Sequence, residues 1–349
     1  MDQQTYRGRR AAVLENETTR VSVILNGGHI AEFLHKRSGV NPLWSPPWPS
    51  IDPSSYDPQL HSEYGTGAEA KLLAGILGHN LCLDIFGGPS EQEAVAGLTV
   101  HGEASIALYE LSSHDGTSAS LRTLLKKSHL IVTRDLRLDG CRLTVVETVE
   151  NLLDFDRPLG WTQHVTLGSP LLTSGDTSID LTAGSSRTYE ERFGNLYASG
   201  QDFHWPLAPG ADGGTVDLRR YPDSAGSAGY TAHLMDDHVD HACFAVASST
   251  AGVAFGYRWR RPDFPWCGMW IENRSRTHAP WAGQTVALGM EFGVSPMPET
   301  RRKMVERGSL FNVPAYRWLP AAGRLTVRYE AAVADFTAGS ANAREALGW

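Results

Sequence analysis

The stretch ASLRTLLKKSHLIVTRDLRLDGCRLTVVETVEN, Ala119–Asn151, decides the fold class of the chain. It divides into three runs whose composition is typical of β-strands: 119–127, 129–138 and 141–151. Valine and threonine, which fit a pleated sheet, are frequent in the third run. Asp139-Gly140 between the last two runs favours a tight hairpin, because both residues tolerate positive φ. The stretch therefore predicts consecutive antiparallel strands.

Similar runs on both sides extend this pattern along the chain. They lie at 11–15, 21–25, 29–35, 81–86, 96–108, 159–167, 230–233, 242–248, 252–258, 285–294 and 324–335. One convincing helix is predicted at Glu299–Arg307, because Pro298 suits a first turn and Gly308 suits the position after a helix. Many short strands with few short helices in 349 residues predict an all-β protein, an antiparallel β-supersandwich.

The domain organisation follows from the places where the pattern of strand-like runs is interrupted. We expect a single β-supersandwich domain over 1–337, with a loop-rich insertion around 173–229 and a C-terminal tail over 338–349. The segment 41–67 carries six prolines and four aromatic residues, which predicts an ordered irregular loop rather than disorder. This loop either lines a binding site or is held to the body by aromatic packing.

Composition narrows the class of function. The formal net charge of -8 argues against binding to nucleic acid or to a membrane surface. The four cysteines are widely spaced, which favours free thiols in a reducing compartment over two disulfides. The first residues show no apolar signal segment, and no uncharged apolar run approaches the length of a membrane span. We therefore expect a cytoplasmic protein that is a monomer or a homodimer.

The stretch PWCGMWIENRSRTHAPWAG, Pro265–Gly283, holds the candidate chemistry. It contains three tryptophans, one acid, two arginines and one histidine: Trp266, Trp270, Trp281, Glu272, Arg274, Arg276 and His278. Bulky apolar neighbours disfavour the charged form of a carboxylate, which is a feature of catalytic acids and bases. Flat indoles beside hydrogen-bonding groups are also typical of a sugar-binding surface. The sequence therefore predicts a carbohydrate site around Glu272.

Two histidines in distant strand-like runs are the candidate partners of this acid. His101 follows LTV, and His164 lies within LGWTQHVTL. Side chains on one sheet face converge across strands however far apart they are in sequence. One carboxylate and two imidazoles suit paired acid–base catalysis near neutral pH.

An ordered set of segments resembles the galactose mutarotase-like, or aldose 1-epimerase, family. The segments are NGGHIAEF, LTVHGEA, WTQHVTLGSP, WIEN and GMEFGVSP. The resemblance implies an antiparallel β-supersandwich and a monosaccharide or sugar derivative as the partner, with no cofactor and no metal. It also implies roles at the anomeric carbon: Glu272 removes the proton of the anomeric hydroxyl, His164 protonates the ring oxygen, and His101 positions that oxygen.

The chain departs from the family pattern and is expected to be a divergent member. The family has an arginine before the histidine of its HG motif, whereas LGHNLCLDIFGG (77–88) contains none. The further residues predicted to bind substrate are His79, Asn80, Asp84, Trp161, Asp236, Trp270, Arg274 and Trp281. Asp237 is the alternative to Asp236 as the family's remaining acid.

Three other interpretations remain open. His101 with Glu103, or His238 and His241 with Asp236, Asp237 and Asp240, could hold a catalytic metal in a β-sandwich enzyme, although the second group also suits an exposed turn. Glu272 with Glu291 or Glu103 could form a glycosidase pair. Glu291, in GMEFG, more readily suggests a structural hydrogen bond or ion pair. Finally, the sandwich could bind a saccharide without turning it over.

Overall fold

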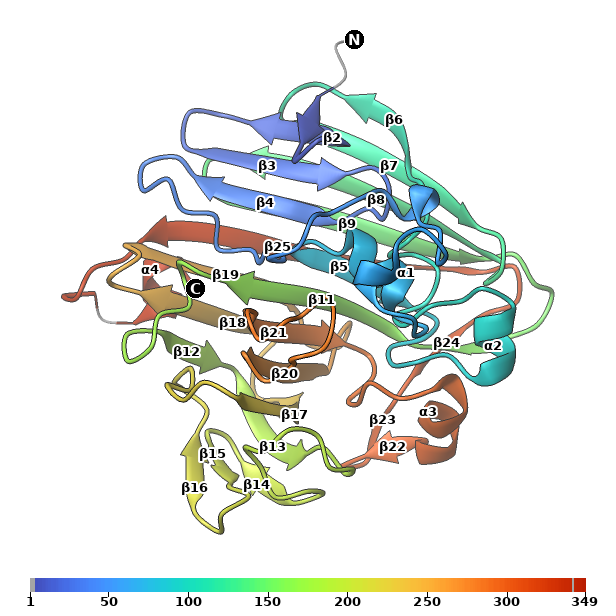
Figure 1. Ribbon diagram of the computed structural model, residues 1–349. Coiled ribbons are helices and arrows are strands. Elements are labelled where there is room, and N and C mark those ends of the chain that lie inside the picture. Colours follow the sequence, from blue (N-terminus) through green and yellow to red (C-terminus); the bar gives the residue numbers. More distant parts are fainter. Residues whose placement is uncertain (1–3, 341) are drawn as a thin grey trace.

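The computed structural model describes residues 4–340 and 342–349, and two large antiparallel sheets dominate it (Figure 1). The eleven-stranded sheet contains, in spatial order, β1 (Thr5–Tyr6), β2 (Arg9–Glu15), β3 (Thr19–Ile24), β4 (Ile30–His35), β5 (His79–Leu83), β11 (Trp161–Gly168), β21 (Val286–Gly293), β20 (Trp266–Asn273), β17 (Ser227–Met235), β13 (Ala183–Thr188) and β14 (Asp202–His204). The eight-stranded sheet contains β12 (Ser178–Leu181), β18 (His241–Ser248), β19 (Val253–Arg260), β25 (Arg324–Asp335), β9 (Arg142–Asn151), β8 (Leu130–Asp139), β7 (Ser118–Leu125) and β6 (Glu110–His114).

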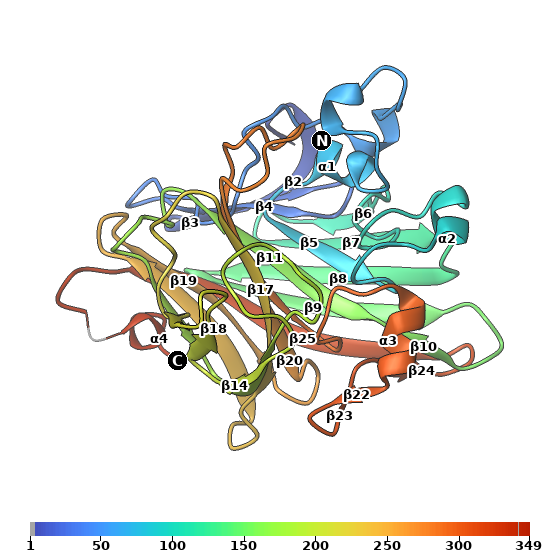
Figure 2. The same cartoon turned by 60° about the horizontal axis from the view of Figure 1, so that its bottom comes forward.

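Small ribbons and short helices complete the described structure. The two-stranded ribbons are β10 (Arg157–Leu159) with β24 (Arg317–Leu319), β15 (Leu207–Pro209) with β16 (Thr215–Asp217), and β22 (Ser309–Leu310) with β23 (Val313–Pro314). The helices are η1 (Pro53–Ser55), η2 (Ser62–Tyr64), α1 (Ala70–Gly75), α2 (Glu91–Val95), α3 (Arg301–Arg307) and α4 (Ala343–Ala346). Figures 1 and 2 both place α2 and α3 side by side at one end of the sandwich. None of the described helices is long and apolar enough to cross a membrane.

The predicted antiparallel all-β sandwich is confirmed, and its core lies between the two sheets. The indole of Trp259 on β19 stacks on Phe292 of β21 with ring centroids 4.3 Å apart. Phe33 of β4 meets Phe255 of β19 edge to face at 5.2 Å. Apolar side chains that alternate along both sheets supply this contact, so burial of their surface is the main stabilising term. The four cysteines are unpaired, as expected.

A buried ion pair crosses the core. Arg134 of β8 and Glu147 of β9 are 2.9 Å apart, and both side chains are almost fully buried. The carboxylate of Glu147 accepts hydrogen bonds from the indole of Trp161 and the amide of Gln163, both on β11. Because a buried charge needs full pairing, this network ties the inner face of β11 to the opposite sheet.

Most strand predictions agree with the structure, but the predicted strand over 96–108 is wrong. This segment is a series of turns, apart from one isolated bridge at Leu108. Its backbone adopts positive φ at Gly97, His101 and Gly102, which an extended strand cannot contain. The helix predicted at 299–307 begins at Arg301, because the side chain of Thr300 accepts from the backbone N–H of Lys303 and caps it.

The insertion and the tail both contribute to the sheets or pack on them. The segment 173–229 contains β12 to β16 and extends both large sheets. In the tail, α4 packs on β18 and β19, where Ala343 and Leu347 cover a face of small alanine side chains.

Candidate active site

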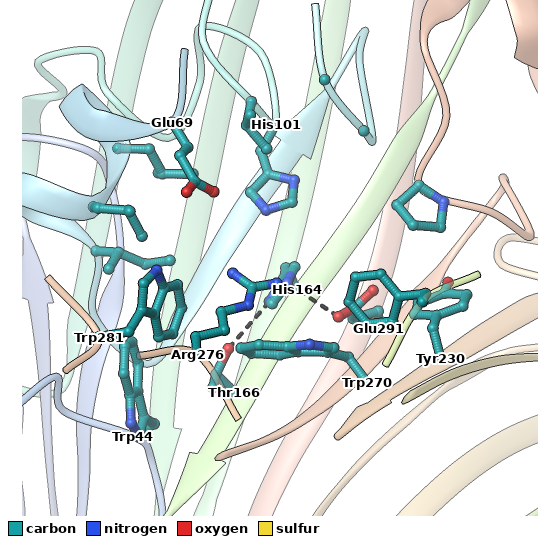
Figure 3. Close-up of a pocket in the computed structure, with 18 of the residues that line it drawn as sticks. Trp44, Glu69, His101, His164, Thr166, Tyr230, Trp270, Arg276, Trp281 and Glu291 are labelled. Atoms are coloured by element: carbon teal, nitrogen blue, oxygen red, sulfur yellow. Dashed lines mark hydrogen bonds and ion pairs between the residues drawn. The ribbon is translucent and has the colours of Figure 1, made fainter. Parts of the chain in front are cut away.

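A cavity of about 230 Å³ lies on the outer face of the eleven-stranded sheet (Figure 3). Its polar lining includes Glu69, His101, His164, Arg276 and Glu291. Much of the remaining wall is aromatic or aliphatic, with Trp44, Leu72, Leu73, Ile76, Val100, Tyr189, Phe193, Tyr230, Trp270, Trp281 and Pro298. A concave apolar pocket with a few converging polar groups is the usual form of a small-molecule site.

The register of four strands brings the polar groups of the floor together. Asn80, His164, Glu291 and Gly268 lie opposite one another on β5, β11, β21 and β20. Residues paired across neighbouring strands share one face of the sheet. These positions therefore all face outward, away from the core, and His164 and Glu291 reach the cavity.

His164 and Glu291 form a buried hydrogen-bonded pair. The Nε2 of His164 is 3.0 Å from Oε1 of Glu291, and both side chains are more than nine-tenths buried. The Nδ1 of His164 is 3.1 Å from the hydroxyl of Thr166. A carboxylate accepts hydrogen bonds, so Nε2 carries the proton, and in the neutral ring the Thr166 hydroxyl donates to Nδ1. An acid and a base thus lie in direct contact.

His101 reaches the cavity from a turn. Its backbone φ of 70° is unusual for a residue other than glycine, and its ring centroid lies 4.8 Å from that of His164. Its Nδ1 is 2.7 Å from the carbonyl oxygen of Phe86, so Nδ1 carries the proton. Burial and then the neighbouring His164 lower the pKa of His101 to about 3. The ring is therefore neutral near pH 7, with Nε2 as an acceptor.

Tryptophans form one wall of the cavity. Trp44, from the proline-rich loop 41–67, stacks on Trp281 with centroids 6.3 Å apart, and Trp281 meets Trp270 edge to face at 6.1 Å. The buried indole Nε1 groups of Trp270 and Trp281 have no partner among the described residues. They are donors available to a ligand hydroxyl. The loop is held by the packing of its aromatics, as one interpretation predicted, and it lines the cavity through Trp44; that the cavity is a binding site stays a prediction.

The expectation that Glu272 meets both histidines is wrong. Glu272 also lies on the outer face of β20, but it pairs with Ala287 and lies beyond Trp270, outside the cavity lining. Its carboxylate accepts from the backbone N–H groups of Ser275 and Arg276 and from the Ser275 hydroxyl. These bonds fix the turn that follows β20. Glu272 therefore stabilises this turn and does not contact the two histidines.

Two further predicted contacts point into the core instead. Trp161 lies three residues before His164 on β11, so alternation puts it on the opposite face, where its indole donates to Glu147. His79 precedes the outward Asn80, and its ring is bonded to Tyr257 and Gln163 between the sheets. Neither side chain lines the cavity.

Asn80 and Asp84 lie close to the site without lining it. Asn80 is fully buried opposite His164, and its amide has no partner among the described residues. Asp84 is paired with Arg157 and Arg301, each at 2.6 Å, and so links the turn before His101 to α3. The structure therefore makes Asp84 an anchor rather than a hydroxyl ligand.

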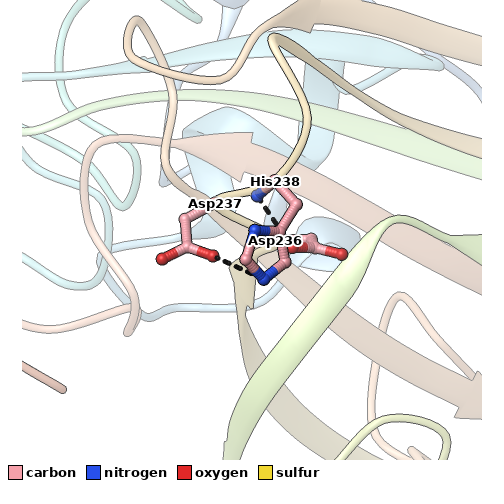
Figure 4. Close-up of side chains that lie close together, drawn as sticks. All are labelled: Asp236, Asp237 and His238. Carbon is pink, nitrogen blue, oxygen red and sulfur yellow. Dashed lines mark hydrogen bonds and ion pairs between the residues drawn. The ribbon is translucent and has the colours of Figure 1, made fainter.

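Arg274 and Asp236 lie elsewhere. Arg274 lines a separate polar cavity beside Trp44. Asp236, Asp237 and His238 form a mostly exposed group in the turn between β17 and β18, with candidate ligand atoms within 4.8 Å of one another (Figure 4). Glu103 accepts from the backbone N–H groups of Lys127 and Ser128 and does not line the cavity with His101.

Glu291, Arg276 and Trp44 line the cavity although none was among the residues predicted to form the site. The sequence offered Glu291 only as an alternative member of a glycosidase pair, and Trp44 only through the loop 41–67. The signal for Glu291 was its alternation with small residues on one face of β21, which are Ala287, Gly289 and Gly293. Small neighbours leave room around a polar side chain, whereas a structural strand face is normally filled. Arg276 enters from the turn after β20, and no periodicity marks such a residue.

The sandwich with this outward cavity has the galactose mutarotase-like fold, and solved structures support that class. A candidate aldose 1-epimerase from Klebsiella pneumoniae matches with a TM-score of 0.65 and 11% identity, covering 95% of this chain and 81% of that one. A candidate aldose 1-epimerase from Escherichia coli K12 matches with a TM-score of 0.63 and 13% identity, covering 94% and 100%. A galactose mutarotase related enzyme from Lactobacillus acidophilus matches with a TM-score of 0.60 and 13% identity, covering 94% and 98%.

These likenesses concern the fold. No model of a known protein family and no curated protein matches the sequence.

Proposed function

We propose that this protein is a carbohydrate-active enzyme of the aldose 1-epimerase type. The observation that carries the proposal is the His164–Glu291 pair, 3.0 Å apart on the floor of an aromatic cavity. The anomeric hydroxyl and the ring oxygen of a sugar are bonded to the same carbon. An acid and a base in contact with each other are therefore placed to serve both oxygens.

In this proposal Glu291 takes the proton of the anomeric hydroxyl while protonated His164 gives a proton to the ring oxygen. The bond between C1 and the ring oxygen breaks, and the C1–hydroxyl oxygen bond becomes a carbonyl. Rotation about C1–C2 and the reverse proton transfers close the ring to the other anomer and restore both residues. Neutral His101 accepts a hydrogen bond from a sugar hydroxyl through Nε2, which orients the ring. Trp270 and Trp281 pack on the sugar.

Polarimetry on pure α-anomers of a set of aldoses tests this function. We expect the protein to accelerate the approach to anomeric equilibrium, and Glu291→Gln to lower kcat by about 10²- to 10⁴-fold, the usual contribution of a general base. Glu103→Gln is the matched control, because that carboxylate lies near His101 in sequence but outside the cavity. Sugar binding without acceleration would instead support a non-catalytic carbohydrate-binding protein.

A further inference from the structure

Among the described residues that line the cavity, Arg276 is the single arginine or lysine. In Figure 3 its side chain lies between the indoles of Trp270 and Trp281. The guanidinium carbon is 5.4 Å from the ring centroid of Trp270 and 4.5 Å from that of Trp281. Cation–π contacts with two indoles hold the guanidinium in place, and the Arg276 side chain is 26% exposed.

Glu272 holds Arg276 in position, but it does not occupy all of the N–H donors of the guanidinium. Oε2 of Glu272 lies 3.6 Å from Nε of Arg276, and Oε1 accepts from the backbone N–H of Arg276 at 3.1 Å. Across the described chain, no other carboxylate approaches the guanidinium within 4.0 Å, and neither terminal nitrogen donates to a protein group. The two terminal nitrogens are therefore available to a ligand in a largely apolar cavity, because Glu272 contacts the guanidinium through Nε alone.

We propose that Arg276 binds a carboxylate of the substrate, so that the preferred sugars are hexuronates. This rests on the proposed function, which places the anomeric carbon at His164 and Glu291. A guanidinium presents two parallel N–H donors that match a carboxylate in a bidentate pair. Because Glu69 and Glu291 also line the cavity, a ligand with one negative charge is repelled less than a phosphate dianion.

Binding to the catalytically disabled Glu291→Gln variant tests the proposal independently of turnover. The probes are glucuronate and galacturonate, their neutral methyl esters, the parent hexoses, and hexose 6-phosphates. Binding is followed by titration calorimetry and by the fluorescence of the cavity tryptophans. We expect at least one hexuronate to bind about 10- to 100-fold more tightly than its methyl ester, the range of a charge-assisted hydrogen-bonded pair. Equal affinity for acid and ester, or tighter binding of the 6-phosphate, overturns the proposal.

Two substitutions of Arg276 in the Glu291→Gln background test whether this arginine causes the preference for the acid over the ester. Arg276→Gln is expected to remove the preference for the acid over the ester, and Arg276→Lys to restore part of it. Arg274→Gln is the matched control, two residues earlier in the same turn region but lining a different cavity. A preference that survives Arg276→Gln contradicts the proposal. If hexuronates bind through Arg276 but the wild-type protein accelerates no mutarotation, the proposed catalysis fails while the binding assignment stands.

Discussion

Glu291 reaches the cavity because glycines surround it. A Cβ at Gly289 would lie 2.5 Å from Oε1 of Glu291 and 3.1 Å from Cβ of Trp270. A Cβ at Gly268, opposite Glu291, would lie 2.1 Å from the hydroxyl of Tyr230. Both glycines are therefore required for space rather than for backbone conformation. The His164–Glu291 pair therefore depends on the absence of side chains at Gly268 and Gly289 as well as on its own two side chains.

Gly289→Ala should misplace the base without unfolding the sheet. The new methyl group pushes the Glu291 carboxylate away from His164, and a displacement near 1 Å costs about 10²-fold in rate. We expect kcat for mutarotation to fall by about that factor, with a urea unfolding midpoint close to that of the wild type. Gly184→Ala, on β13 of the same sheet, adds its methyl group to open space and is the control. Wild-type kcat in Gly289→Ala would contradict this account.

At the residue scale the sequence predicted some neighbours correctly. It predicted that His101 and His164 lie together and that Trp270 and Trp281 lie beside them, and all four line one cavity. It chose Glu272 over Glu291, and the structure places Glu291 beside His164 instead. Both acids lie at outward positions of their strands, and only the pairing of β21 with β11 and β20 shows which one is opposite His164. Alternation alone, however, excludes Trp161 once His164 faces outward.

Among the elements, α3 holds one rim of the cavity in place. Arg307 at its end donates to Glu190, in the loop after β13, and to Glu299 just before the helix. The same loop carries Phe193 to the cavity. The Arg307 side chain is 12% exposed, so these charge-assisted bonds are shielded from water more than a surface pair is. The helix and the loop are therefore expected to move together.

Arg307→Ala tests this coupling against a neighbour on the same helix. Loss of both carboxylate contacts should lower the free energy of unfolding by about 1–2 kcal/mol and raise KM, because the loop that carries Phe193 loosens. Arg302→Ala, which removes an exposed pair with Glu306, should change stability by less than about 0.5 kcal/mol. Urea denaturation and mutarotation kinetics measure the two effects. Equal destabilisation by both substitutions would contradict the assignment.

Element prediction succeeded where the period of two was strong. The strand expected at 324–335 is β25 with the same bounds, and the Asp139-Gly140 turn joins β8 to β9. It failed at 96–108, where apolar residues are frequent but the backbone turns at Gly97 and His101. A positive φ at a histidine is imposed by tertiary contacts, here the bond from Nδ1 to Phe86, and no local pattern announces it.

At the scale of the whole molecule, burial lowers the pKa of several histidines, so these side chains resist protonation. Burial lowers the pKa of His29, His101 and His233 to about 3 each, from an ordinary value of 6.5. Burial, followed by the charge of Arg134, also lowers the pKa of His79. The unfolded chain therefore binds more protons than the folded chain below pH 6.5. The stabilising effect of keeping these rings neutral is present above that pH and is lost as pH falls toward about 3.

Acid should therefore destabilise the fold before its carboxylates titrate. Each such histidine contributes up to about 1.4 kcal/mol per pH unit, so for the first three together the slope rises below pH 6.5 toward a limit of about 4 kcal/mol per unit. Urea unfolding between about pH 7 and pH 5 measures this slope. His233→Gln should reduce it, whereas His204→Gln on the exposed β14 should leave it unchanged. A flat profile over this range would show that the buried rings accept protons in the folded state.

The two faces of β11 have different surroundings. Gln163 and Trp161 face the buried ion pair between the sheets, while His164 and Thr166 face the cavity. Substitutions that alter the ligand on one face need no compensation across the core on the other. The cavity can therefore change while the scaffold is retained, which makes the outer face of β11 and its neighbours the natural place to redesign the cavity for other ligands.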